Sequence, residues 1–149
     1  MASIPGPASV IAAVVVHAGR MCLLLRSEAV GSDGGKWHCV TGYLPAGIDP
    51  LHHAVEEIQE ETGLGPNQLR LLDRALPLRL TGGGRRWTVF PFLFEASSPV
   101  LQLNWEHQEY RWVSNGELQG HEIVPWLRDV CRAVLPRRDF ERQAEASTA

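Results

Sequence analysis

The sequence predicts a single α+β domain in which a mixed β-sheet is packed between helices. First, 149 residues are enough to bury one sizeable core. Second, most of the chain consists of apolar or β-branched runs bounded by turn residues, and only two segments have the apolar spacing of a helix. Third, neither an internal repeat nor a linker divides the chain. We expect the domain over residues 10–136, between a flexible N-terminus (1–9) and a disordered tail (137–149).

The first half of the chain predicts a hairpin, a loop and a short strand. Val10–His17 and Met21–Arg26 are two apolar runs separated by a glycine-containing turn, which is typical of a β-hairpin. Residues 29–36 are rich in Gly, Ser and Asp and predict a loop. Trp37–Tyr43 then has the composition of a short strand.

A helix is predicted directly after this strand. Asp49 is a good N-cap, Pro50 fits the first helical position, and Gly63 supplies the left-handed stop. Its inner face is an apolar stripe made of Leu51, Ala54, Val55 and Ile58.

The second half of the chain predicts further strands and one more helix. Leu69–Leu78 and Arg86–Ala96 have the pattern of two long strands around a glycine-rich turn. Val100–Leu103 and Glu109–Val113 are expected to be shorter strands. Ile123–Leu135 has apolar residues at helical spacing and predicts an amphipathic helix.

Composition and charge argue against several classes of partner. The 14 basic and 17 acidic residues give a net charge of −3, and no basic stripe is present, so a DNA or RNA polymer is not expected to bind. Cys22, Cys39 and Cys131 lack the spacing of a zinc site, which favours reduced thiols and a cytoplasmic location. The apolar run at 10–16 is too short to cross a membrane.

Three glutamates on one face of the predicted middle helix indicate a metal site. Glu57, Glu60 and Glu61 are spaced i, i+3 and i+4, so their carboxylates repel one another on one helix face. Carboxylate oxygens suit Mg²⁺, which is commonly shared with the oxygens of a substrate phosphate. Taken alone, the same pattern would also suit a solvated acidic face.

The segment 42–64 resembles the Nudix box. That pattern is a glycine, five residues, Glu, seven residues, Arg-Glu, an apolar residue, any residue, Glu-Glu, any residue, Gly and an apolar residue. The matching positions are Gly42, Glu57, Ile58, Glu60, Glu61, Gly63 and Leu64. The resemblance implies an αβα Nudix sandwich with a mixed sheet, in which the box forms a loop–helix–loop.

Two positions depart from the pattern, because Ile48 replaces its first Glu and Glu56 replaces its Arg. A salt bridge commonly joins these two positions in the family. Replacement of only one residue would leave the other without its partner, whereas replacement of both does not. The family also uses the backbone carbonyl of the residue before the box glycine as a metal ligand, which is Thr41 here.

A second resemblance lies at Glu106-His107, where several Nudix hydrolases have a Glu-His ahead of a strand ending in Trp. The resemblance implies metal ligation by the box glutamates Glu57, Glu60 and Glu61, by Glu106 and by the Thr41 carbonyl. It also implies catalytic roles for Glu60, Glu61 and Glu106, among which the general base is not distinguished.

The implied reaction is Mg²⁺-dependent cleavage of a phosphoanhydride in a nucleoside diphosphate derivative, with Mn²⁺ as a possible substitute. A nucleoside triphosphate or a dinucleoside polyphosphate would be such a substrate. Phosphate-binding candidates are Arg26, Lys36, Arg85 and Arg86. Candidates for stacking on a base are Trp37, Tyr43 and Trp87. The tryptophans also suit the core, above all Trp112 and Trp126.

Alternative interpretations remain open from the sequence. A noncatalytic Nudix-fold module that binds a nucleotide or partner is favoured by Ile48 and Glu56. An isomerase on the same scaffold would need a reactive thiol, for which Cys39 is the candidate, although a buried structural thiol is the simpler interpretation. The six histidines are expected at the surface rather than as ligands. The resemblance also makes a homodimer plausible.

Overall fold

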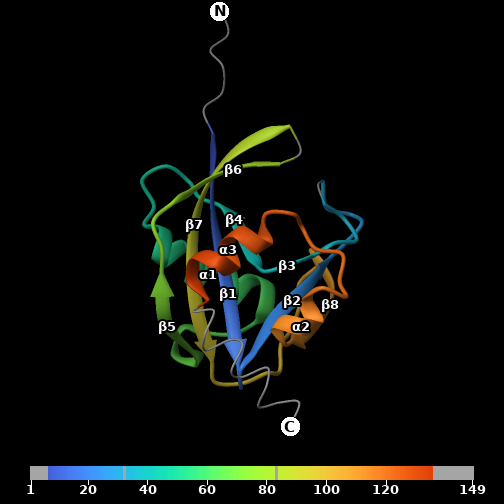
Figure 1. The fold of residues 1–149 in the computed structure, drawn as a ribbon. Coiled ribbons are helices and arrows are strands. Elements are labelled where there is room, and N and C mark those ends of the chain that lie inside the picture. The colour runs from blue at the N-terminus through green and yellow to red at the C-terminus, as the bar shows by residue number, and fades with distance from the viewer. Residues whose placement is uncertain (1–6, 32, 83, 136–149) are drawn as a thin grey trace, which may run out of the picture.

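The computed structural model describes residues 7–31, 33–82 and 84–135. The strands are β1 (Ala8–His17), β2 (Arg20–Arg26), β3 (Trp37–His38), β4 (Val40–Tyr43), β5 (Leu69–Arg74), β6 (Leu78–Gly82), β7 (Arg85–Ala96) and β8 (His107–Val113). The helices are α1 (Pro50–Thr62), α2 (Asn115–Leu118) and α3 (Leu127–Val134), with a 3₁₀ turn at Pro66–Gln68. Figure 1 shows their arrangement. None of the described helices has the length and apolar character needed to cross a membrane.

The strands form one mixed sheet, as predicted. Strands β3, β2, β1, β7 and β5 follow one another in that order, while β4 pairs with β1, β6 with β7 and β8 with β2. The central pair, β1 and β7, runs parallel, and the other strand pairs are antiparallel. The predicted hairpin is β1–β2, in which His17 faces Arg20.

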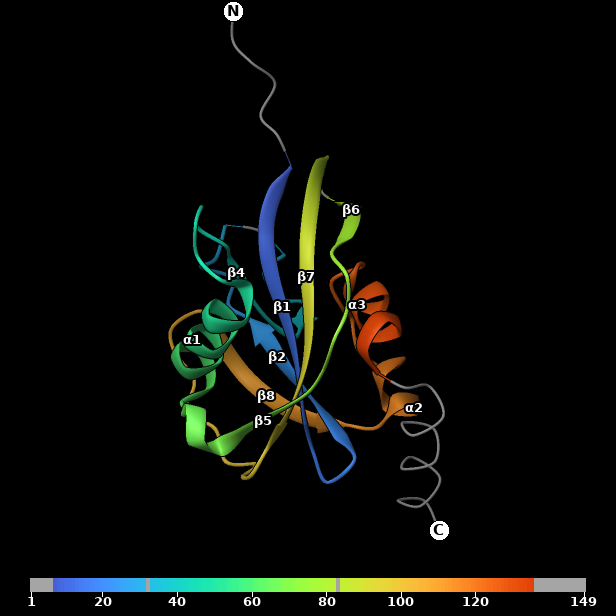
Figure 2. The same cartoon turned by 90° about the vertical axis from the view of Figure 1, so that its left-hand side faces the viewer.

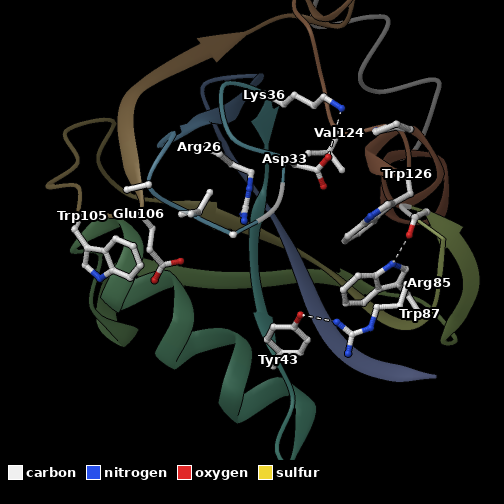
Figure 3. A pocket seen from close by; sticks show the side chains of 15 residues that line it. Arg26, Asp33, Lys36, Tyr43, Arg85, Trp87, Trp105, Glu106, Val124 and Trp126 are labelled. Carbon is white, nitrogen blue, oxygen red and sulfur yellow. Dashed lines mark hydrogen bonds and ion pairs between the residues drawn. The ribbon is translucent and has the colours of Figure 1, made fainter. Parts of the chain in front are cut away.

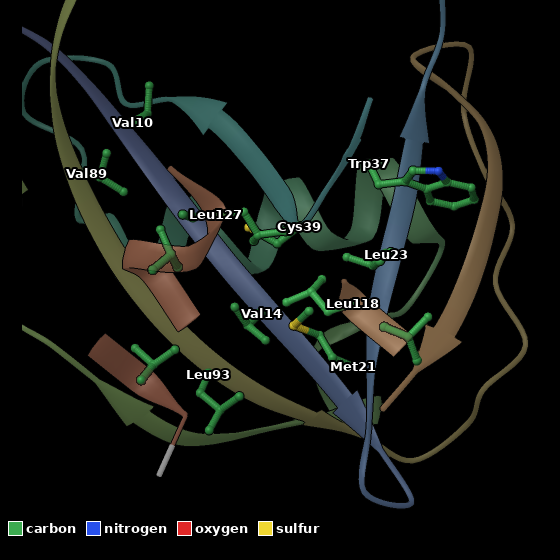
Figure 4. Packing of buried hydrophobic residues seen from close by; sticks show 14 residues of the cluster. Val10, Val14, Met21, Leu23, Trp37, Cys39, Val89, Leu93, Leu118 and Leu127 are labelled. Carbon is green, nitrogen blue, oxygen red and sulfur yellow. The ribbon is translucent and has the colours of Figure 1, made fainter. Parts of the chain in front are cut away.

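Helices cover both faces of this sheet, which confirms the expected α+β sandwich. Helix α1 lies on one side of β1 and β7, and α2 and α3 lie on the other (Figure 2). Successive side chains of a strand point to opposite faces. Accordingly, Ile11, Ala13 and Val15 belong to the core beneath α1. Val10, Ala12 and Val14 belong to the core beneath α3, part of which is shown in Figure 4. The continuous apolar run of β1 therefore reflects burial on both faces.

Helix α1 has the predicted ends and the predicted inner face. The Asp49 carboxylate accepts a hydrogen bond from the His52 N–H at 3.1 Å. Gly63 has a φ of 76°, and its N–H donates to the Gln59 carbonyl at 2.9 Å. Ala54 and Ile58 are fully buried against the sheet. The helix is thus fixed in rotation as well as in position.

Several predicted boundaries were wrong. The predicted strand Leu69–Leu78 is two strands separated by a segment that contains Pro77, which has no N–H to donate to a ladder. Val100–Leu103 is not a strand. Residues 8 and 9, expected in the flexible N-terminus, belong to β1.

The last helix begins at Leu127 rather than Ile123. Pro125 disfavours a helical conformation for Val124, the residue before it, and Ile123 forms a β-bridge with Trp37. Val124 instead donates its N–H to the Trp37 carbonyl at 2.9 Å. The predicted flexibility of residues 1–6 and the predicted disorder of the tail lie outside the described residues.

Replacing Ile58 with alanine should test whether packing on the sheet stabilises α1. The substitution leaves a cavity in the core beneath this helix, so we expect a loss of about 3 kcal/mol in the free energy of unfolding. The exposed neighbour Gln59 provides the matched control, for which Gln59→Ala should change stability by less than about 0.5 kcal/mol. Urea denaturation measures both variants, and equal effects would contradict this packing arrangement.

Candidate active site

Four glutamates are neighbours at one end of the sheet, near enough for their charges to interact. Glu57, Glu60 and Glu61 extend from α1, and Glu106 comes from the loop that precedes β8. The pairing of β2 with β8 sets Arg26 opposite His107. This register also lets the Ser27 N–H donate to the Glu106 carbonyl at 2.8 Å. The strand pairing thus brings the Glu106 segment alongside Arg26, far from it in sequence.

Glu61 is the most unusual member of this group, because its side chain is only 1% exposed. Burial is the main cause that raises the pKa of Glu61 well above its ordinary value, and the nearby carboxylates of Glu57 and Glu106 raise it further. A side-chain hydrogen bond with Glu57 also raises the pKa of Glu61, while its Oε2 atom has no hydrogen-bond partner among the described residues. Burial, followed by the charge of Glu60, also raises the pKa of Glu57. A cation at this place would offset these energetic costs.

Gly42 makes room for the Glu57 side chain. It lies on β4 opposite Ile11, beneath α1. A Cβ atom added at Gly42 would lie only 2.7 Å from both Cγ and Oε1 of Glu57. A side chain at this position would therefore displace the Glu57 carboxylate from its present place.

The donor chemistry at this place fits a hard divalent cation. Glu57, Glu61 and Glu106 offer oxygen ligands, and the unpartnered Oε2 of Glu61 is available to a metal. Within the part of the chain that the structure describes, no three His, Cys, Asp or Glu side chains are already grouped closely enough to hold an ion. Binding would therefore require side-chain rotations. Thr41, next to Gly42, lines the smaller of two cavities at this site, and ligation by its carbonyl stays a prediction.

His107 lies against Glu61 but does not neutralise it. The His107 Nε2 atom is 3.5 Å from Glu61 Oε1, and both side chains are buried. Burial, together with the guanidinium of Arg26, lowers the pKa of His107 to about 4. The imidazole is therefore neutral at physiological pH, and the contact is not an ion pair there.

A cavity of about 1000 Å³ opens beside Glu106 (Figure 3). Its residues come from both halves of the chain, and Trp105 and Glu106 lie on the side opposite Trp87 and Trp126. Among the lining residues are Arg26, Asp33, Lys36, Tyr43, Arg85, Trp87, Trp105, Glu106, Val124 and Trp126. A smaller cavity of about 130 Å³ shares several of these residues and also reaches His38, Thr41 and Gly42.

Aromatic side chains form one wall of the larger cavity. The Tyr43 and Trp87 rings have centroids 5.9 Å apart. The Arg85 guanidinium lies 5.0 Å from the Trp87 ring centroid and also donates a 3.2 Å hydrogen bond to the Tyr43 hydroxyl. Trp87 in turn donates from Nε1 to the Gly82 carbonyl at 3.3 Å. These contacts hold the Tyr43 and Trp87 rings in place, and a planar ligand could stack against their faces.

His38 lies at the floor of the smaller cavity beside Trp126. The two rings are edge-to-face with centroids 4.5 Å apart. The contact exists because the Trp37 N–H donates to the Glu122 carbonyl and the Trp37 carbonyl accepts from the Val124 N–H, which brings this segment alongside β3. Neither ring nitrogen of His38 has a hydrogen-bond partner among the described residues. Burial, then the charges of Arg26 and His107, lowers the pKa of His38 to about 3, so the ring is neutral.

The predicted substrate-binding residues divide into two groups. Arg26, Lys36 and Tyr43 line the cavity, as do the further candidates Arg85 and Trp87. Trp37 instead belongs to the core beneath α3, where the Arg111 guanidinium covers its ring at 4.7 Å. Arg86 is exposed on β7 and is not among the described residues that line either cavity.

The sequence interpretation missed Trp105, Trp126 and His38 as cavity residues. It assigned Trp126 to the core, and this ring does pack against the core beneath α3 while also lining both cavities. The expectation of surface histidines was wrong for His38, His53 and His107, which are buried. Placement of these rings depends on strand pairing, which has no local signature.

Cys39 is the buried structural thiol that the sequence predicts. It is part of the core beneath α3, and burial raises the pKa of its thiol well above the ordinary value. A thiol of this kind is a poor nucleophile. None of the three cysteines forms a disulfide.

Neutral buried histidines should make the fold sensitive to acid. The pKa of His38 falls from 6.5 to about 3 on folding, so below about pH 6.5 the unfolded chain binds the proton first and stability drops as the pH falls. We expect His38→Asn to reduce this slope, which is at most about 1.4 kcal/mol per pH unit for one group. Urea midpoints between about pH 7 and about pH 4 would measure it. The same slope in the variant would refute this role of His38.

Comparison with known proteins relates this chain to a protein family. A family model for the NUDIX domain matches residues 6–134. The chain is 26% identical over 140 residues to an RNA pyrophosphohydrolase from Sphingopyxis alaskensis, with 81% of this chain and 87% of that protein covered. Its fold is similar to that of the MutT protein from Methanosarcina mazei Go1, with a TM-score of 0.68 and 24% identity over 99% of this chain and 100% of that one. It is also similar to that of a C. elegans Ap4A hydrolase, with a TM-score of 0.60 and 22% identity over 95% and 97%.

The matched segment includes the whole sheet, the glutamate-bearing helix α1 and the residues of both cavities. The chain therefore belongs to the NUDIX domain family.

Proposed function

We propose that this protein is a Mg²⁺-dependent pyrophosphohydrolase that cleaves a phosphoanhydride bond in a nucleoside diphosphate derivative, and that Mn²⁺ can substitute for Mg²⁺. The observation that carries this proposal is the buried carboxylate of Glu61, which has an unpartnered oxygen and two acidic neighbours, one of which, Glu106, lines a large cavity. Fixed negative charge of this kind matches a cation bound together with a polyphosphate.

Glu57, Glu60, Glu61, Glu106 and the Thr41 carbonyl are the proposed metal ligands. The bound metal would supply charge neutralisation for the diphosphate and lower the pKa of an attacking water. Glu60, Glu61 and Glu106 are the proposed catalytic residues. Of these three, Glu106 lines the larger cavity, Glu61 is buried and is not among the described lining residues, and Glu60 is exposed. Glu106 therefore has the most direct access to a water in the cavity, which a general base requires.

Cationic side chains around the larger cavity are proposed to hold the phosphate oxygens. Arg26 lies on the same side of the cavity as Glu106 (Figure 3). Lys36 also lines the cavity, where its Nζ is 3.4 Å from Asp33 Oδ1. A guanidinium offers two parallel donors to a phosphate, whereas an ammonium acts as a point charge.

The aromatic wall and His38 are proposed to hold the base of the nucleotide. Trp87 and Tyr43 offer ring faces for stacking. His38 is neutral, so it offers one N–H donor and one nitrogen acceptor to the polar edge of a planar group. A nucleobase combines both properties. The names of the two relatives, an RNA pyrophosphohydrolase and an Ap4A hydrolase, both refer to nucleotide compounds.

We further propose a small-molecule substrate, a cytoplasmic location and a homodimer. The net charge of −3 does not favour binding of a long polyanion. Three cysteines without a disulfide suit a reducing compartment. Size-exclusion chromatography with light scattering would test the dimer.

Replacing Glu61 with glutamine tests the catalytic proposal, because the charge is removed while the shape is kept. We expect kcat/KM to fall by about 100-fold or more with Mg²⁺, and wild-type activity to disappear in EDTA. The assay would measure phosphate or nucleotide release from nucleoside triphosphates, dinucleoside polyphosphates, ADP-ribose and a short RNA with a 5′-triphosphate. Glu109→Gln is the matched control, since Glu109 is exposed on β8 and pairs with Arg111 at 3.0 Å.

The possible outcomes of this assay distinguish the catalytic proposal from its alternatives. Full activity in Glu61→Gln would show that the metal is misplaced. Absence of turnover on every compound, with nucleotide binding unchanged by EDTA, would instead favour the noncatalytic module that Ile48 and Glu56 suggest. Turnover of the RNA alone would overturn the proposed small-molecule substrate.

Gly42→Ala should weaken metal binding through Glu57. The added Cβ would displace the Glu57 carboxylate, so we expect Mn²⁺ affinity to fall by about 10-fold or more, measured by electron paramagnetic resonance without substrate. Gly116→Ala in α2 is the control, because a Cβ there meets nothing within 4 Å. Equal Mn²⁺ affinity in both variants would contradict the role of Glu57.

A further inference from the structure

Helix α1 has an unusual balance of charge. Its sequence includes Glu56, Glu57, Glu60 and Glu61, but neither Lys nor Arg. The nitrogen-bearing side chains of this helix that contact its carboxylates are therefore its two histidines, His52 and His53. They differ strongly in environment, since the His52 side chain is 69% exposed and that of His53 only 11%.

His53 lies between two carboxylates. Its Nε2 atom is 3.2 Å from Glu57 Oε1, and its Nδ1 atom is 3.5 Å from Glu56 Oε2. Positions i, i+3 and i+4 of a helix lie side by side, which explains both contacts. Nε2 is closed off from solvent and has no hydrogen-bond partner among the described residues, so its 3.2 Å approach to Glu57 is a close contact and not a formed hydrogen bond. The Glu57 carboxylate is thus the group toward which this nitrogen can direct an N–H.

Glu57 is consequently held from two directions. His53 approaches its carboxylate from the preceding turn of α1, and β4 approaches it at Gly42. A free glutamate side chain samples many rotamers, and restricting it before a ligand arrives reduces the entropy lost on binding. The arrangement therefore restricts the Glu57 carboxylate to a defined position before a metal ion binds.

The same contacts explain how Glu56 is accommodated. The box pattern has Arg at this position, whose partner position is occupied here by Ile48, an exposed residue. Glu56 instead lies 2.9 Å from His52 Nε2 and reaches His53 on its other oxygen. The partners of Glu56 thus come from its own helix.

We propose that His53 is a positioning residue that orients the Glu57 carboxylate for a divalent cation, with Glu56 orienting His53 from the other side. The role resembles that of the hydrogen-bonded groups that stand behind metal ligands in other proteins. This inference rests on the proposed function, because it assumes that Glu57 binds the metal.

A matched pair of substitutions tests the inference. His53→Met and His53→Gln give side chains of similar length, but only Gln retains an N–H donor that can face Glu57. We expect Met to weaken Mn²⁺ binding by about 10-fold and Gln to retain affinity within about 3-fold of wild type. Electron paramagnetic resonance of the substrate-free protein gives the affinity, and circular dichroism establishes that each variant is folded. His52→Ala is the control and should stay within about 2-fold.

A double-variant cycle separates failure of the inference from failure of the proposed function. Glu57→Gln should weaken Mn²⁺ binding, and His53→Met should then have no further effect in that background, because His53 acts through Glu57. Effects of the two substitutions that multiply, or equal affinities in His53→Met and His53→Gln, would overturn the role of His53 while the metal site stands. Unchanged Mn²⁺ affinity in Glu57→Gln would refute the metal assignment, and the role of His53 with it.

Discussion

Burial of the Glu61 carboxylate is the constraint from which the rest of the site follows. Ala54 and Ile58 pack α1 against the sheet, and this packing fixes the rotation of the helix. Three residues beyond Ile58, the same rotation turns Glu61 into the protein, where burial and two nearby carboxylates raise its pKa. An interior carboxylate with an unpartnered oxygen destabilises the isolated protein. Its presence is understandable if a cation compensates for the charge, so the hydrophobic core and the proposed metal site are parts of one arrangement.

The cavity has two chemically different sides, and the sheet holds both. One side is formed by Glu106 from the loop before β8 and by Arg26 at the end of β2, whereas the described lining of the cavity includes no residue of α1. The aromatic side comes from β4, β7 and the segment before α3. Because β1 and β7 lie at the centre of the sheet, neighbouring strands deliver both sides to the same end of the fold (Figure 1). Low pKa values keep the two histidines at this end neutral, so they add hydrogen-bonding groups without adding positive charge.

The two departures from the box pattern leave the geometry of the acidic group intact. Gly42 still faces Glu57 across the gap between β4 and α1. Glu56 has histidine contacts on its own helix, and Ile48 is exposed and needs no polar partner. A salt bridge between positions 48 and 56 is therefore not required to place Glu57 or Glu61. This observation weakens the case that the departures by themselves abolish catalysis.

The sequence alone was sufficient for the fold class, the hairpin, the caps of α1 and the glutamate face, because these depend on local spacing and turn chemistry. The glycine and glutamates of the box have a fixed separation along the chain, which makes them recognisable without a structure. Trp126 and His38 could not be found in this way. They come together because Trp37 pairs with the 122–126 segment, and strand pairing between distant residues leaves no local pattern. Tertiary structure likewise decided that Trp37 is buried in the core while Trp87, which packs against the same core, also lines the cavity, since the burial of each ring depends on contacts with segments distant in the sequence.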